Sequence, residues 1–360
     1  MHNVCLVPAV CFLLAAQAAY SPRADLDQGR FLKALADAED RLASNSSDAL
    51  ALAAKAQALC ALMRLGEAED SAKRALEIKP GLPDALLARA LVTGAKAIQQ
   101  RNLNSVMMFS QAMDDLKAAT KGDPAYPLAW ATLGIAYQQL PALLGGSTKK
   151  ALDCAERLEA VQPSKGFLLH GQVLALGGKW GSAQPFFRQA LTLSPNDPTI
   201  AAGYLEALSE KVTKKALGEE AQKQLLATEA RRLLPKVKRS ALGMEAVSLA
   251  LLEAGLDEEA WNAALGALPG ADAPSILKLQ LGKVAARAEI HQEEGLAFLK
   301  EAASEPLEGG TGGYAQVYWR MGQILKSLDR RDEAVKAAKE ALRYNQWHRG
   351  AKELMESLAK

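Results

Sequence analysis

The sequence predicts an all-α fold, arranged as an array of helical hairpins. Of its 360 residues, 49% are hydrophobic but only 5% are aromatic, and alanine and leucine dominate, which suits helices that pack closely against helices. Stretches rich in β-branched residues are few, so a sheet has little to be built from. A chain of this length exceeds one small core, and a short motif recurs along it, so an array of repeats is expected.

The recurring motif marks the second helix of each hairpin. A small residue is followed four positions later by an apolar residue and three positions after that by another, usually alanine. These spacings place all three on one helical face. Copies begin at Ala68, Ala112, Ala151, Ala183, Ala260 and Ala334. In four copies a proline, which cannot continue a helix, follows five residues after the last member, at Pro80, Pro124, Pro163 and Pro195.

A matching first helix precedes several of these second helices. It carries two large residues separated by a glycine, as in Trp130/Leu133/Gly134/Tyr137, Phe167/His170/Gly171/Leu174 and Tyr318/Met321/Gly322/Leu325. We expect the large residues to point into the hairpin and the glycine to let the partner helix approach closely. The two helices together define one repeat.

This paired pattern resembles the tetratricopeptide repeat (TPR), most strongly over 125–196 and 313–346. The resemblance implies a right-handed superhelical solenoid of antiparallel helix pairs, and a TPR protein of an exported, bacterial type. About seven pairs and a C-terminal capping helix over 347–360 are expected. The expected segments are a signal peptide (1–18), N-terminal TPR-like pairs (25–124), best-matching pairs (125–198), degenerate pairs (199–308) and a C-terminal TPR with its cap (314–360). A boundary is also expected near 235–240, where Leu234-Pro235 interrupts a helix.

The first residues have the features of an export signal. Val4 to Ala16 is an apolar run too short to span a bilayer, and Ala16-Gln17-Ala18 is a small-x-small cleavage pattern. Cleavage after Ala18 predicts a periplasmic or secreted protein. Lipid attachment at Cys11, an uncleaved anchor and a cytosolic start are the alternatives. No second run reaches the length of a membrane span, so the mature chain is expected to have no transmembrane segment.

Charge and motifs argue against an enzyme. The net charge of +2, from 43 basic and 41 acidic residues, gives no general attraction to nucleic acid. The sequence has no phosphate-binding loop, nucleophile elbow or zinc-binding helix. Cys60 and Cys154 are expected to be buried thiols, and Ser147 or Thr148 to cap a helix after the Gly145-Gly146 turn. We therefore expect no catalytic residue, cofactor or metal.

A solenoid presents a concave groove lined by the first helices, and residues between the packing positions should face it. The candidate partner-binding residues are Ile135, Gln138, Leu168, Gln172, Trp319, Gln323 and Lys326, with Gln57 in the first pair. Trp319 is of interest because Tyr318 already fills the packing position; the alternative is that Trp319 packs on the neighbouring pair or on the glycine-rich junction before this helix. The groove lacks the paired lysine and asparagine with which some TPR proteins grip carboxylates. An apolar or extended segment suits it better.

The sequence thus predicts a non-catalytic scaffold that binds a protein partner in its groove and is a monomer or weak oligomer. A second hypothesis is a solute-handling accessory that binds a small ligand. It arises because the insertion from Leu140 to Lys150 resembles a segment of the TPR-like partners of periplasmic transport systems.

Overall fold

The computed structural model describes residues 22–27, 29–100, 104–308 and 313–359, so the predicted signal peptide over 1–18 lies outside the described residues. Within those residues every regular element is a helix, and the chain is all-α as predicted. The α-helices of the N-terminal half are α1 (Arg23–Asp27), α2 (Phe31–Ser44), α3 (Ala49–Ala61), α4 (Leu65–Ile78), α5 (Pro83–Gln100), α6 (Asn104–Gly122), α7 (Pro127–Gln139), α8 (Thr148–Val161), α9 (Pro163–Leu176) and α10 (Trp180–Leu193). Those of the C-terminal half are α11 (Pro198–Ser209), α12 (Lys211–Leu217), α13 (Glu219–Val237), α14 (Ala241–Glu253), α15 (Asp257–Ala267), α16 (Pro274–Ala288), α17 (Gln292–Ser304), α18 (Gly313–Ser327), α19 (Arg331–Tyr344) and α20 (Arg349–Ala359).

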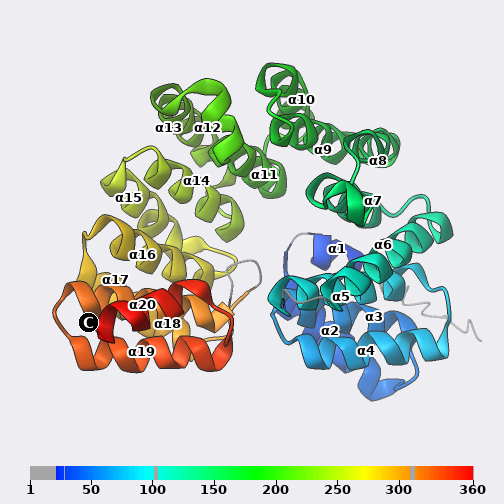
Figure 1. Cartoon of the computed structure of the whole chain (residues 1–360), viewed down its shortest axis with the longest axis horizontal. Coiled ribbons are helices and arrows are strands. Elements are labelled where there is room, and N and C mark those ends of the chain that lie inside the picture. The colour runs from blue at the N-terminus through cyan, green and yellow to red at the C-terminus, as the bar shows by residue number, and fades with distance from the viewer. Residues whose placement is uncertain (1–21, 28, 101–103, 309–312, 360) are drawn as a thin grey trace, which may run out of the picture.

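Consecutive helices pack as antiparallel pairs. In the described part of the chain the pairs are α3/α4, α5/α6, α7/α8, α9/α10, α11/α13, α14/α15, α16/α17 and α18/α19, eight against an expectation of about seven. Helix α20 packs on α18 and α19 as the terminal cap. Figure 1 shows the pairs following an arc, with α9, α11, α14 and α16 on its inner side and α10, α13, α15 and α17 outside.

Short polar residues begin several helices. Ser147 starts α8, and its Oγ accepts the backbone N–H of Lys150 at 3.3 Å, which confirms the predicted cap. Asp48 caps α3 in the same way, with its carboxylate accepting the N–H groups of Leu50 and Ala51. Each cap satisfies backbone donors that a helix leaves unpaired at its start.

The motif glycines sit where helices meet most closely. A Cβ added at Gly134 or Gly171 would lie 2.7 Å from Leu169 or 2.8 Å from Phe187, closer than side chains pack. The same holds for Gly322, where Leu354 of α20 would be 2.7 Å away. The predicted approach of the partner helix is confirmed at Gly171, because Phe187 belongs to α10. At Gly134 and Gly322 the nearest side chains belong instead to α9 and α20, the next helices beyond the pair.

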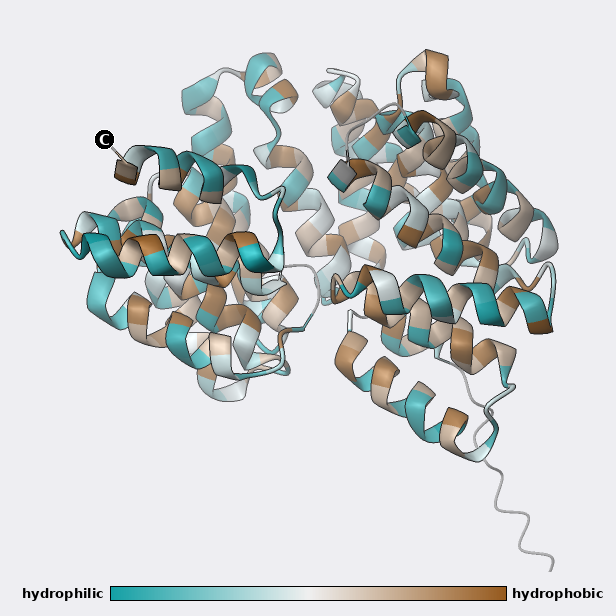
Figure 2. Cartoon of the chain, turned by 60° about the horizontal axis from the view of Figure 1, so that its bottom comes forward, coloured by the Kyte–Doolittle hydropathy of each residue, from teal (hydrophilic) through white to brown (hydrophobic). Residues whose placement is uncertain are grey.

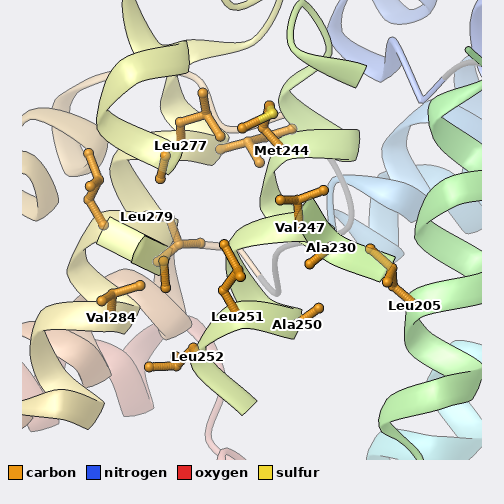
Figure 3. Close-up of a cluster of buried hydrophobic side chains, with 14 of the residues drawn as sticks. Leu205, Ala230, Met244, Val247, Ala250, Leu251, Leu252, Leu277, Leu279 and Val284 are labelled. Atoms are coloured by element: carbon orange, nitrogen blue, oxygen red, sulfur yellow. The ribbon is translucent and has the colours of Figure 1, made fainter. Parts of the chain in front are cut away.

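The largest core runs without a break through the segment that the sequence shows as degenerate. Figure 3 shows Met244, Leu251, Leu277 and Val284 from α14 and α16 meeting in it, and all are almost completely buried. Burying each such side chain contributes about 1.5–3 kcal/mol. Along the helices in Figure 2, apolar residues alternate with polar ones, as expected of helices with one buried face.

The boundary expected near 235–240 is wrong. Helix α13 continues through Pro235 to Val237, and Leu233 and Val237 on either side of the proline are buried in that core. Proline removes one backbone hydrogen bond, but it does so in the last turn of a helix that tertiary packing holds in place.

The arc also brings the two ends of the array together. The buried carboxylate of Glu308, in the loop after α17, accepts the backbone N–H of Leu32 at the start of α2, with 3.1 and 3.2 Å to its two oxygens. A cavity of about 360 Å³ beside this bond is lined from both ends, by Leu32 and Met63 and by Leu307 and Tyr344 among others. We call the Glu308–Leu32 interaction the closing contact.

Candidate binding groove

The inner side of the arc holds a cavity formed by the first helices of three consecutive pairs. Its volume is about 280 Å³. The residues that line it are Ile135, Gln138 and Gln139 of α7, Leu169, Gln172, Val173 and Leu176 of α9, Glu206 and Ala207 of α11, and Glu210 directly after α11. Three of the predicted groove residues, Ile135, Gln138 and Gln172, therefore come together in one place.

Their position follows from the repeat. Gly134 and Gly171 face neighbouring helices, and the next residue is turned by about 100° around the helix, toward the inner side. Ile135 and Gln172 occupy that position in α7 and α9. One turn further on, Gln139 and Leu176 extend the same two rows.

The cavity combines an apolar floor with amide groups. Leu169 and Val173 are buried beneath it, whereas Ile135 keeps 40% of its surface exposed. The amide nitrogen of Gln172 donates to the carbonyl of Gly203 at 3.3 Å, which fixes that side chain against α11. The Oε1 atom of Gln138 is buried and has no hydrogen-bond partner. The surface thus offers apolar contact together with unused hydrogen-bonding capacity.

Two carboxylates stand at one end of this cavity. Glu206 lies on α11 and Glu210 directly follows the last residue of that helix, and neither forms an ion pair within the described residues. Burial, and then the charge of Glu210, raise the pKa of Glu206 above its ordinary value. Both glutamates also line a second cavity of about 680 Å³, between α11, α13 and α14. The groove therefore continues past them with an acidic character.

The other predicted groove residues lie elsewhere. Leu168 packs toward α11, where a Cβ on Gly203 would be 2.9 Å from it. Lys326 turns toward the terminal cap and donates to Ser357 at 2.9 Å. Gln323 accepts a hydrogen bond from Arg320 Nη1 at 2.8 Å, on the same helix. None of these three lines the cavity between α7, α9 and α11.

Trp319 is part-buried between its own helix and the cap. The Arg320 guanidinium lies 3.9 Å from the centre of the indole ring, and the His348 ring centre lies 4.9 Å away on another side. A Cβ on Gly350 would be 2.5 Å from the indole. The indole therefore packs on the segment at the start of the terminal cap, a position that neither expectation named.

The expectation that Gln57 lines the groove is wrong. Gln57 is buried, and its amide nitrogen donates to the carbonyl of Asp84 at 3.0 Å. Helix α1 packs on α3 beside it, and Arg23 of α1 pairs with Asp84 and Asp123 at 2.8 and 2.7 Å. The short N-terminal helix thus covers this part of the inner surface, which the repeat pattern could not show.

Sequence reasoning missed Glu206, Glu210 and Arg320. Helix α11 has no glycine in the motif position, so nothing in its sequence marked the residues that face the groove. In α16 a signal exists: Lys283 follows Gly282 just as Gln172 follows Gly171. Lys283 and Arg287 pair with Glu245 and Glu253 of α14 at 3.5 and 2.7 Å.

A comparison with protein families supports the repeat assignment. Residues 315–346, which form α18 and α19, match the model of the tetratricopeptide repeat. This segment is a tetratricopeptide repeat. No curated protein matches the chain.

Several solved structures are similar to this chain at low sequence identity. A thermophilic TPR protein of Thermus thermophilus is 22% identical, with 52% of this chain and 99% of that chain covered and a TM-score of 0.44. A tetratricopeptide repeat protein from Parabacteroides merdae is 16% identical over 76% of this chain and 97% of that one, with a TM-score of 0.38. The Cut9–Hcn1 hetero-tetramer of the APC/C matches at 16% identity, covering 89% and 58%, with a TM-score of 0.43.

Among the described residues, no group of three or more histidine, cysteine or acidic side chains could hold a metal ion. None of the helices described is both long and apolar enough to cross a bilayer. Cys60 and Cys154 are free, buried thiols, as predicted.

Proposed function

We propose that this TPR repeat protein is a non-catalytic scaffold that holds an extended segment of a partner protein in its inner groove. TPR proteins generally act in protein–protein interaction. The observation that supports the groove as the binding surface is the row formed by Ile135, Gln138 and Gln172, where an exposed apolar side chain adjoins amides with unused hydrogen-bonding capacity.

The chemistry of the groove favours a particular kind of segment. An extended backbone has free N–H and C=O groups, and a glutamine side chain can both donate to and accept from them. The apolar floor would take an apolar side chain of the segment. The unpaired Glu206 and Glu210 favour a basic side chain at the α11 end.

Site-specific photo-crosslinking tests this proposal. A photoreactive residue placed at Gln172 should crosslink to a discrete partner in intact cells of the source organism. The same residue at Thr192, exposed on the outer helix α10 of the same pair, should not. When Ile135→Asp is added to the protein that carries the photoreactive residue at position 172, the crosslink should disappear, because the substitution places a charge on the apolar surface. Identical products from both positions, or none from Gln172, would contradict the groove as the binding surface.

We also propose that the protein is an exported TPR protein of bacterial type, either periplasmic or secreted. The support is the apolar run and cleavage pattern within residues 1–18. Mass spectrometry of the protein purified from its source should find a chain that begins at Ala19. A chain that retains Met1 would contradict cleavage.

A further inference from the structure

Arg320, on α18, is a buried cation without a counter-ion. Only 9% of its surface is exposed. Its Nη1 atom donates to Gln323 Oε1 at 2.8 Å, while its Nε atom is buried and has no partner. Within the described ranges no carboxylate lies at ion-pair distance from it. Arg23, by contrast, is satisfied by two aspartates.

The charged groups that face Arg320 are positive. Arg287 of α16 is the neighbour that, after burial, lowers the pKa of Arg320 to about 10. Arg320 in turn, together with burial, lowers the pKa of His348, which lies just before α20. Arg287 is already neutralised by Glu253 at 2.7 Å. The cluster therefore carries one positive charge that no protein group compensates.

Such an arrangement costs stability. A buried charge without a counter-ion loses its hydration and gains no ion-pair attraction in return, and proteins normally pair buried charges. A neutral neighbour does not remove this cost. The Oε1 atom of Gln316, one turn earlier on α18, is also buried and unpartnered, and a bond to it would satisfy an N–H but supply no charge.

We infer that Arg320 and Gln323 form a subsite for a carboxylate group of a ligand on the inner side of the C-terminal pair. One uncompensated positive charge matches one negative charge. The oxygen of Gln323 is already occupied by Arg320, so its amide N–H groups remain to donate. A carboxylate has two acceptor oxygens, one for the guanidinium and one for the amide.

The structure also holds the guanidinium in place for this role. Trp319 stacks against it at 3.9 Å, and the indole in turn packs closely against Gly350. This subsite does not use the paired lysine and asparagine with which some TPR proteins bind carboxylates. The carboxylate can come from a free organic acid or from an acidic side chain or C-terminus of a protein segment.

Titration calorimetry with the full chain in chloride buffer tests the subsite. The probes are propionate, and a short peptide with either a free or an amidated C-terminus. Arg320→Gln should weaken binding of the carboxylate probe roughly 10–100-fold, the loss expected for a charge-assisted hydrogen bond. Arg343→Gln is the matched control, because Arg343 also stacks on a ring, that of Tyr344 at 4.7 Å, but pairs with Glu340 at 2.7 Å.

The probes separate the two sources. Binding of propionate points to a free acid, and binding of the free-carboxylate peptide but not of propionate or the amide points to a protein segment. Failure of the wild type to bind any carboxylate probe would overturn the subsite, as would equal binding by Arg320→Gln.

Two further variants keep the test decisive. Gln323→Leu leaves the charge but removes the amide donors, and it should weaken the same probes by less than Arg320→Gln does. Without probe, Arg320→Met should unfold at a higher urea concentration than the wild type, because it removes the uncompensated charge; a lower one would contradict that premise. The Arg320 subsite lies on α18, outside the cavity at Gln172, so a failed crosslink at Gln172 and a failed titration here are distinguishable.

Discussion

Substitution of Gly166 by alanine should destabilise the protein although the same change usually strengthens a helix. Gly166 is in the first turn of α9, directly against the backbone of α8. An added Cβ would lie 2.3 Å from the Glu159 nitrogen and 2.4 Å from its Cα, distances that real Cβ atoms do not show. Because the obstacle is backbone, no rotation of a side chain can relieve it.

The two opposing effects can be sized. Alanine is favoured over glycine within a helix by about 1 kcal/mol. Forcing extra volume into a packed interface costs about 1–3 kcal/mol, and a backbone obstacle places this site at or above the upper end. Moving α8 would also disturb the Glu159–His170 pair at 2.9 Å and the stack of His170 on Phe186 at 4.0 Å. We expect a net loss of about 2 kcal/mol for Gly166→Ala.

Gly181→Ala is the control. Gly181 lies in the first turn of α10, and nothing would come within 4 Å of its Cβ. This variant should be more stable than the wild type by about 0.4–1 kcal/mol. Urea unfolding followed by the helix signal in circular dichroism should therefore shift in opposite directions for the two variants. A Gly166→Ala midpoint at or above that of the wild type would refute the reasoning from contact distances.

Three further outcomes are expected. Glu308→Ala should lower the free energy of unfolding by about 1 kcal/mol, as for loss of a helix cap. The control is Ser304→Ala, which should not change it, because Ser304 is exposed and its hydroxyl is bonded only to the Glu301 carbonyl. Equal urea midpoints for the two variants would contradict a role for the closing contact. Burial raises the pKa of Glu308 despite its backbone hydrogen bonds, so the folded chain binds a proton at this carboxylate more readily than the unfolded chain does. The wild type should therefore gain stability relative to Glu308→Ala as the pH falls from neutrality toward 4.5, the ordinary pKa of a glutamate. A stability difference between the two proteins that does not change over this pH range would contradict the raised pKa. Burial raises the pKa of the Cys60 thiol to about 11 and that of the Cys154 thiol to about 12. Iodoacetamide at about pH 8 should therefore label neither thiol in the folded protein and both in urea. Rapid labelling of either thiol without urea would contradict their burial.

The sequence was most informative where the repeat is regular. The glycines at 134, 171 and 322 identified the pairing of helices, and those at 134 and 171 also identified the residues that follow them into the groove. Sequence reasoning worked less well where position depends on a distant segment. Gln57 fits the groove register but is covered by α1, and Pro235 has the chemistry of a helix end but lies in a helix whose core holds it.

Arg320 shows a further limit of the sequence. Its neighbours Trp319 and Gln323 were recognised as candidate binding residues from their spacing, but an unpaired buried charge is a property of three-dimensional surroundings. Whether an arginine has a carboxylate nearby depends on α16 and the segment before α20, which no local pattern describes. The sequence therefore indicated where Arg320 lies in the repeat, but it could not show that this arginine lacks a counter-ion.

The closing contact changes how this array should unfold. In an open solenoid each unit touches only the units before and after it, so the terminal units loosen first and independently. Here the start of α2 is bonded to the loop after α17, and the first and last parts of the chain are also neighbours. Loosening of either end exposes the other, so the two ends should exchange their amide hydrogens as one cooperative unit.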